Sequence, residues 1–143
     1  MLSFLWSVYP FGLGAIGAIG AWIATSFYGG PIRRFFDLRG ELERARIAAM
    51  LTPIPMKSFL GVDINTMDPA FPAFEQVRQE LRKAGIDMLA FGQAEPAARL
   101  LRWFGYDAVE IGNGALALGN FLGEGIHPRR ERDAALRKAL RIK

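Results

Sequence analysis

The sequence contains no cysteine and one histidine, His127. The absence of cysteine excludes disulfides, iron–sulfur clusters and thiolate chemistry, and it leaves the redox compartment open. A single imidazole excludes any site that needs two histidines from one chain. Charge is also missing from one part of the sequence, because the first charged residue is Arg33. The 143 residues have the length of about one domain and divide into an uncharged first part and a charged second part.

Motifs for catalysis or for metal binding are also missing. The sequence has no phosphate-binding loop and no nucleophile elbow, and His127 precedes a proline at a predicted helix start. Asp63, Asn65 and Asp68 lack the spacing, the glycine and the glutamate of a calcium loop. We therefore expect a protein that is not an enzyme, with no catalytic residue, no cofactor and no metal site.

The uncharged part predicts a transmembrane anchor over residues 1–30. Pro10–Tyr28 is an almost wholly apolar stretch of 19 residues. As a helix it would be roughly 28 Å long, close to the thickness of the hydrocarbon core of a bilayer. Aromatic residues cluster near both ends of this stretch, as is typical of side chains at the two lipid headgroup layers. They include Trp6, Tyr9, Trp22 and Tyr28.

A cleaved signal peptide is the alternative interpretation of this segment. Such a peptide has basic residues before a short apolar core, whereas nothing basic precedes this long one. Arg33, Arg34 and Arg39 follow the predicted span, and basic flanks stay on the cytoplasmic side. We therefore expect a single-pass protein of the bacterial inner (cytoplasmic) membrane, with its N-terminus outside and its C-terminal domain in the cytoplasm.

One face of the predicted span carries small residues about four positions apart. Small side chains allow two helices to approach closely in lipid, where packing drives association. This face is a candidate contact with a second copy or with another membrane subunit, although glycine is also common in membrane helices without such a role. The candidate contact residues are Gly14, Gly17, Ala18, Ala21 and Thr25.

The segment after the span, residues 31–50, has the three-and-four spacing of an amphipathic helix. Gly29-Gly30-Pro31 before it can bend the chain. Because the segment starts beside the membrane, we expect it to lie along the surface and to contact lipid. The arginines alone have a second explanation, which is that they only set the topology. The candidate lipid-contacting residues are Arg33, Arg34, Phe35 and Phe36.

Residues 51–68 are a predicted linker and residues 69–143 a predicted helical domain. In the domain, apolar spacing predicts one helix over 70–91 that passes through Gly85 without a break. A short helix follows over 96–104, with Leu100, Leu101 and Phe104 inward. Asp107 then caps a helix ending near residue 122, and Pro128 starts the last one. The predicted fold is all-α, with one N-terminal transmembrane helix and a small cytoplasmic bundle of about four to five helices.

Two stretches resemble a known family. Phe27–Glu41 (FYGGPIRRFFDLRGE) and Ala98–Asp107 (ARLLRWFGYD) are similar to those of short, uncharacterised proteobacterial membrane-anchored proteins. The resemblance implies one N-terminal span and a mostly helical domain. That family has no assigned activity, so the resemblance supports the architecture and adds no chemistry.

The last stretch, Arg129–Lys143, has seven basic and two acidic residues. Next to a membrane, a basic amphipathic helix favours lipid binding, with a solvated face as the alternative; no nucleic-acid partner is expected because no recognition motif is present. We expect an accessory or structural subunit of a larger inner-membrane complex that contacts other membrane-protein subunits. The alternative is a self-associating membrane-surface adaptor that binds anionic lipid or a soluble partner.

Overall fold

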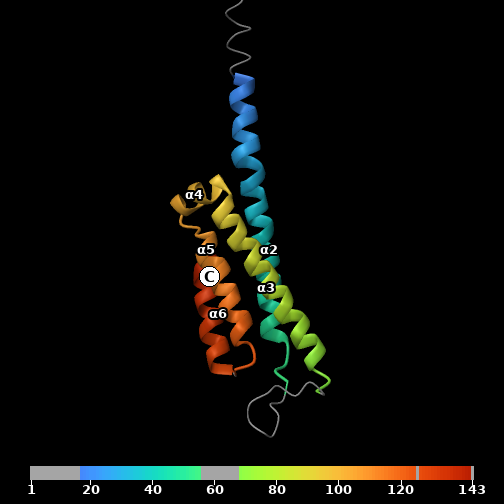
Figure 1. The fold of residues 1–143 in the computed structure, drawn as a ribbon. Coiled ribbons are helices and arrows are strands. Elements are labelled where there is room, and N and C mark those ends of the chain that lie inside the picture. Colours follow the sequence, from blue (N-terminus) through green and yellow to red (C-terminus); the bar gives the residue numbers. More distant parts are fainter. Residues whose placement is uncertain (1–16, 56–67, 125, 143) are drawn as a thin grey trace, which may run out of the picture.

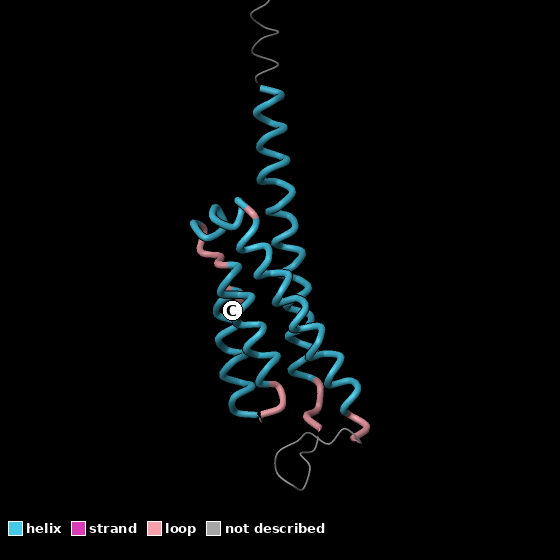
Figure 2. The backbone as a smooth tube through the Cα atoms, in the orientation of Figure 1, coloured by secondary structure: helices cyan, strands magenta, loops and turns pink. Residues whose placement is uncertain are grey.

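The computed structural model describes residues 17–55, 68–124 and 126–142, and this part of the chain is all-α, as predicted. Residues 17–24 are helical and run into a π turn, η1 (Thr25–Gly29). Five α-helices follow, joined by short connections except between α2 and α3 (Figures 1 and 2). They are α2 (Gly30–Leu51), α3 (Phe71–Ala94), α4 (Pro96–Trp103), α5 (Ala108–Phe121) and α6 (Ile126–Leu140).

The four longer helices, α2, α3, α5 and α6, lie side by side, and α4 crosses one end of them (Figure 1). The helical segment of residues 17–29 projects from the same end, which we call the proximal end. The most extensive contacts are those of α3 with α5, followed by α2 with α3 and α5 with α6. The opposite, distal end of the bundle holds the last turn of α2 and the first turn of α3.

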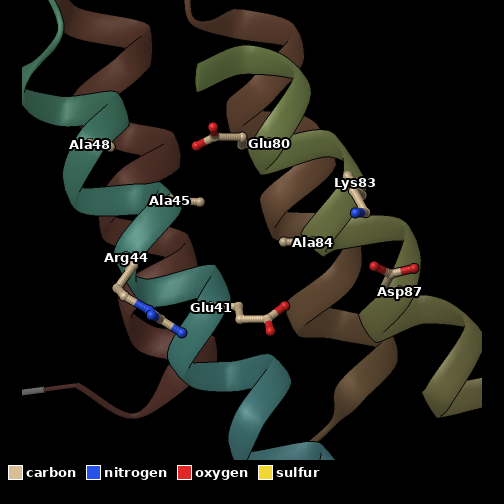
Figure 3. A pocket seen from close by; sticks show the side chains of 8 residues that line it. All are labelled: Glu41, Arg44, Ala45, Ala48, Glu80, Lys83, Ala84 and Asp87. Atoms are coloured by element: carbon tan, nitrogen blue, oxygen red, sulfur yellow. The ribbon is translucent and has the colours of Figure 1, made fainter. Parts of the chain in front are cut away.

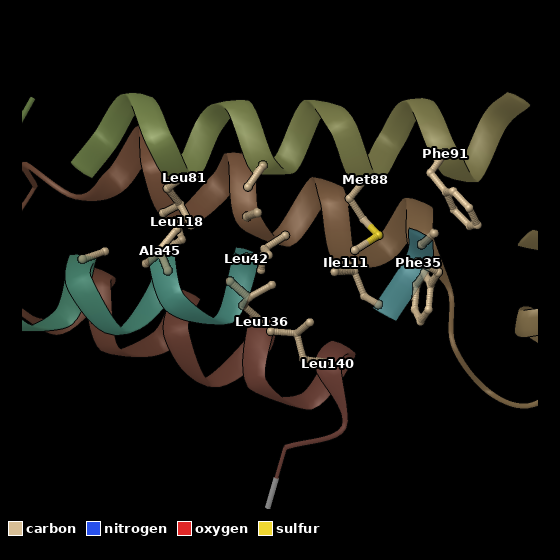
Figure 4. Close-up of a cluster of buried hydrophobic side chains, with 14 of the residues drawn as sticks. Phe35, Leu42, Ala45, Leu81, Met88, Phe91, Ile111, Leu118, Leu136 and Leu140 are labelled. Carbon is tan, nitrogen blue, oxygen red and sulfur yellow. The ribbon is translucent and has the colours of Figure 1, made fainter. Parts of the chain in front are cut away.

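All five helices contribute to one hydrophobic core. In Figure 4, side chains of α2 and α3 meet those of α5 and α6 along the bundle axis. Because α2 supplies part of this core, residues 31–50 are packed into the same unit as the helices that follow the linker. The largest fully buried apolar side chains are Phe35, Leu42, Leu81, Met88, Phe91, Ile111, Leu118, Leu122, Leu136 and Leu140.

Glycines set the close approach of α3 and α5. A Cβ atom built on Gly112 of α5 would lie 2.8 Å from the carbonyl oxygen of Gly85 in α3 and 2.6 Å from Cγ of Leu89. A Cβ on Gly92 would lie 2.8 Å from Cγ2 of Val109. Only hydrogen fits at these positions, so the two backbones pack directly against each other. The predicted continuity of one helix through Gly85 is confirmed.

The connection from α4 to α5 has a distinct residue at each of its ends, Gly105 and the predicted cap Asp107. Gly105 has φ +84°, a left-handed conformation that glycine adopts without strain and that commonly ends a helix. The Asp107 carboxylate accepts hydrogen bonds from the backbone N–H groups of Val109 and Glu110, and so caps α5.

Two predicted breaks are wrong. The chain stays helical through Gly29-Gly30-Pro31, because the π turn lets the Gly30 N–H donate to the Thr25 carbonyl oxygen and accommodates the proline that follows. The last helix begins at Ile126 and not at Pro128. A proline is tolerated there because the first four N–H groups of a helix have no partner within the helix.

The predicted membrane helix is only partly within the described residues. Among residues 17–55, 68–124 and 126–142, no helix is long and apolar enough to cross a membrane.

A polar cluster lies between α2 and α6. Nη1 of Arg46 is 2.8 Å from Oδ1 of Asp133, and both side chains are largely buried. One turn away, Arg129 is also buried and donates from Nη2 to the Thr52 carbonyl oxygen at 3.1 Å. Burial lowers the pKa of the Arg129 guanidinium, while the Asp133 carboxylate acts in the opposite direction. The cluster fixes where α6 packs on α2.

Candidate interaction surfaces

The projecting helix carries six of the thirteen candidate site residues that the sequence singled out. The small residues Gly17, Ala18, Ala21 and Thr25 are all exposed on it, and so are Trp22 and Tyr28. Gly14, Trp6 and Tyr9 lie outside the described residues. The exposed side chains here are uncharged and mostly apolar, with Trp22 64% exposed. An apolar helix exposed on all sides needs a cover of lipid or protein.

The candidate lipid-contacting residues of α2 separate into two groups. Phe35 is fully buried, with its ring 5.7 Å from those of Phe91 and Tyr106, so its expected role as a lipid contact is replaced by a role in the core. Phe36, one position along, remains 45% exposed. Arg33 and Arg34 are exposed on the same stretch. A helix that packs in a bundle presents only one side to its surroundings, and Phe35 lies on the inner side.

The structure adds a surface on α4 that the sequence analysis did not identify. Trp103 is 88% exposed and Phe104 is 64% exposed, whereas Phe104 was expected to point inward. The reason is that α4 ends at Trp103, so Phe104 leaves the helical path while Ala97, Ala98 and Leu101 face the core. Tyr28 and Trp103 border the same shallow hollow. We call the exposed aromatic residues of the proximal end the collar: Tyr28, Phe36, Trp103 and Phe104.

Exposed arginines lie on the same helices as the collar residues. Arg99 and Arg102 are exposed on α4, and Arg33 and Arg34 are exposed near the start of α2. Two carboxylates lie beside this group: Glu95 is 3.5 Å from Arg34, and Asp107 is 2.9 Å from Arg102. Two arginines and two aromatic residues lie within residues 99–104, namely Arg99, Arg102, Trp103 and Phe104, and this mixture is the sequence signal that could have identified the α4 part of this surface.

A second surface is a charged groove between α2 and α3 (Figure 3). Its volume is about 490 Å³. Alanines form its floor, and charged side chains of both signs stand on its two sides. This combination of a shallow apolar floor and charged walls fits a polar helix or peptide segment better than a small apolar molecule. The lining residues are Glu41, Arg44, Ala45, Ala48, Glu80, Lys83, Ala84 and Asp87.

The described residues bring no group of three or more His, Asp or Glu side chains together in a metal-binding arrangement. His127 is exposed in the first turn of α6. The basic residues of α6 are in part engaged within the fold: Arg141 donates to the Phe104 carbonyl oxygen at 2.8 Å, and Arg132 lies 4.7 Å from the centre of the Phe121 ring.

The architecture is thus a small helical bundle with an exposed apolar helix at one end. Comparison with protein-family models, with curated proteins and with solved structures finds no match to the chain.

Proposed function

We propose that this protein is a non-enzymatic accessory subunit of a bacterial inner-membrane complex, held by an N-terminal transmembrane helix with its bundle in the cytoplasm. The observation that carries the proposal is the uncharged segment before Arg33, whose described part is an apolar helix exposed to its surroundings. Lipid would cover this segment, and its small residues would contact a neighbouring membrane helix. The same architecture agrees with the proteobacterial family that the sequence resembles.

The groove between α2 and α3 supports the docking part of the proposal. It lies on the bundle and not on the projecting helix, so one partner could contact the chain inside the membrane and in the cytoplasm. Its charged walls would fix the register of a partner segment, because charges determine specificity more than affinity.

The anchor is tested by placing one charge in the projecting helix. Ile19→Arg is expected to move a large share of the protein from the membrane pellet to the supernatant in alkaline carbonate, because an arginine within a span strongly disfavours insertion. The matched control is Ile47→Arg, since Ile47 is exposed to a similar extent on the same continuous helix but within the bundle. The control should stay in the pellet. If the unmodified chain were extracted by carbonate, the anchor would be refuted.

The subunit role is tested by native electrophoresis after extraction from the native membrane in mild detergent. We expect the tagged protein to migrate in a hetero-complex much larger than the 15.8 kDa chain. Pull-down with the same tag should recover other membrane proteins. Migration as a small homo-oligomer would contradict the subunit role and would favour the self-associating adaptor instead.

A further inference from the structure

We infer that the collar inserts into the anionic lipid headgroup layer next to the anchor, so that α4 is a second membrane contact of this protein. The inference rests on the proposed anchor and adds to it a lipid-binding site outside the transmembrane segment. Tyr28 belongs to the predicted span and Phe36 to the predicted lipid-contacting residues, so the new part of this site is Trp103 and Phe104.

The position of Tyr28 places the collar at headgroup depth. A span that starts at Pro10 would reach the far side of the hydrocarbon core at about Tyr28, by the usual rise of about 1.5 Å per residue. Tyr28 and Trp103 border the same hollow at the proximal end. If Tyr28 lies in the inner headgroup layer, Trp103 therefore lies there too.

The chemistry of the collar fits this layer. Trp103 and Phe104 expose large rings to their surroundings, and aromatic rings of this kind are enriched where headgroups meet acyl chains. Arg99 borders the same hollow as Tyr28 and Trp103, and Arg33 adds a second exposed positive charge near the start of α2. Aromatic and basic residues together favour an anionic lipid surface over a purely apolar protein partner.

The distal end of the bundle is the part that should stay out of the lipid if only the collar is inserted. Leu51 is 79% exposed at the last residue of α2, about 30 Å along that helix from Gly30 by the usual helical rise. A surface-bound collar would keep this end in water. An insertion of the whole bundle into lipid would not.

The experiment uses the full chain in vesicles that contain phosphatidylglycerol and acyl-chain-brominated lipid, which quenches tryptophan. The chain has three tryptophans, so Trp6→Phe and Trp22→Phe leave Trp103 as the only reporter. We expect bromine near the headgroup end of the chain to quench Trp103 about twice as strongly as bromine at the chain terminus, because interfacial groups lie roughly 5–10 Å into this boundary. A matched reporter, Leu51→Trp with all three native tryptophans replaced by Phe, should not be quenched.

The charge requirement is tested with the same reporter. Arg33→Gln with Arg99→Gln is expected to reduce the quenching of Trp103 by about half, because each juxtamembrane arginine contributes attraction to anionic lipid. Arg82→Gln with Arg130→Gln removes the same charge from exposed positions outside the collar and the groove and should leave the quenching unchanged.

The outcomes separate the two proposals. In one outcome, Trp103 and the Leu51→Trp reporter are quenched equally in a chain that resists carbonate extraction. This result overturns the inference about the collar but does not contradict the anchor. A blue-shifted Trp103 emission without lipid quenching also overturns it, because a protein partner or a second copy then covers the collar. A chain that carbonate extracts overturns both.

Discussion

Replacing Gly112 with alanine is expected to lower the free energy of unfolding by about 3 kcal/mol, at the upper end of the usual cost of overpacking. The added Cβ would lie 2.8 Å from the Gly85 carbonyl oxygen and 3.0 Å from the Leu89 backbone nitrogen. Backbone atoms within a helix cannot move independently, so the whole of α5 must shift away from α3. Chemical denaturation in mild detergent, followed by circular dichroism, measures the loss.

Gly40→Ala is the matched control for this prediction. Gly40 is also within a helix, but a Cβ built there meets no atom within 4 Å. Alanine should therefore stabilise the protein by roughly 0.5–1 kcal/mol, because it restricts the unfolded chain and suits a helix. The same substitution is thus expected to lower the free energy of unfolding at Gly112 and to raise it at Gly40. Equal stabilisation at both would show that α3 and α5 are not in backbone contact.

The helix α3 shows which features of this fold can be predicted from the sequence alone. Its apolar positions recur at three and four residues over about five turns, and the structure buries Phe74, Leu81 and Met88 as that spacing predicts. The predicted cap at Asp107 is confirmed as well. Periodicity and capping depend on residues that are close in the sequence, so a single chain is enough to predict them.

Helix boundaries next to proline were harder to predict. Pro128 was taken as a start signal, but proline suits any position of the first turn, and α6 begins two residues earlier. Gly29-Gly30-Pro31 was taken as a bend, but a π turn lets the helix continue. Proline restricts the backbone, yet the sequence alone does not say which of the permitted geometries is adopted.

The arginine and aromatic residues at 99–104 could have been noticed in the sequence, but the collar as a whole could not be predicted, because its residues come together only in the folded chain. Tyr28 and Trp103 are far apart in the sequence and border one hollow because α4 crosses the proximal end of the bundle. Local spacing also placed Phe104 inside, since it follows Leu100 by four residues. The end of α4 at Trp103 changes the direction of the chain and exposes Phe104.

The position of α4 also connects the fold with the proposed function. The helices that build the core run along the bundle axis, whereas α4 lies across them at the end from which the helical segment of residues 17–29 projects (Figure 1). A helix in this position closes the core on one side and presents Trp103 on the other. If the proposed anchor were the only connection to a membrane, the bundle would be free to rotate about it. A second contact through the collar would fix its orientation, and with it the direction in which the groove between α2 and α3 faces.

The largest loss of stability is expected from Asp133→Ala, at about 3–5 kcal/mol, the usual cost of removing one partner of a buried ion pair. The Asp133 carboxylate is the only acidic group near two buried guanidinium groups in the described part of the chain, those of Arg46 and Arg129. Without it, both cations stay in a poorly solvated space between α2 and α6. Chemical denaturation should show a lower midpoint concentration of denaturant. The packing of α6 should be lost at a lower concentration than the packing of the other helices.

Two comparisons distinguish loss of the ion pair from general damage to α6. Glu131→Ala removes an exposed carboxylate from the same helix and should change the free energy of unfolding by less than about 0.5 kcal/mol. Arg46→Met combined with Asp133→Ala should be more stable than Asp133→Ala alone, because the double variant no longer buries the Arg46 charge without its partner. If the two substitutions were additive, the 2.8 Å contact between Arg46 and Asp133 would not contribute to holding α6 against α2.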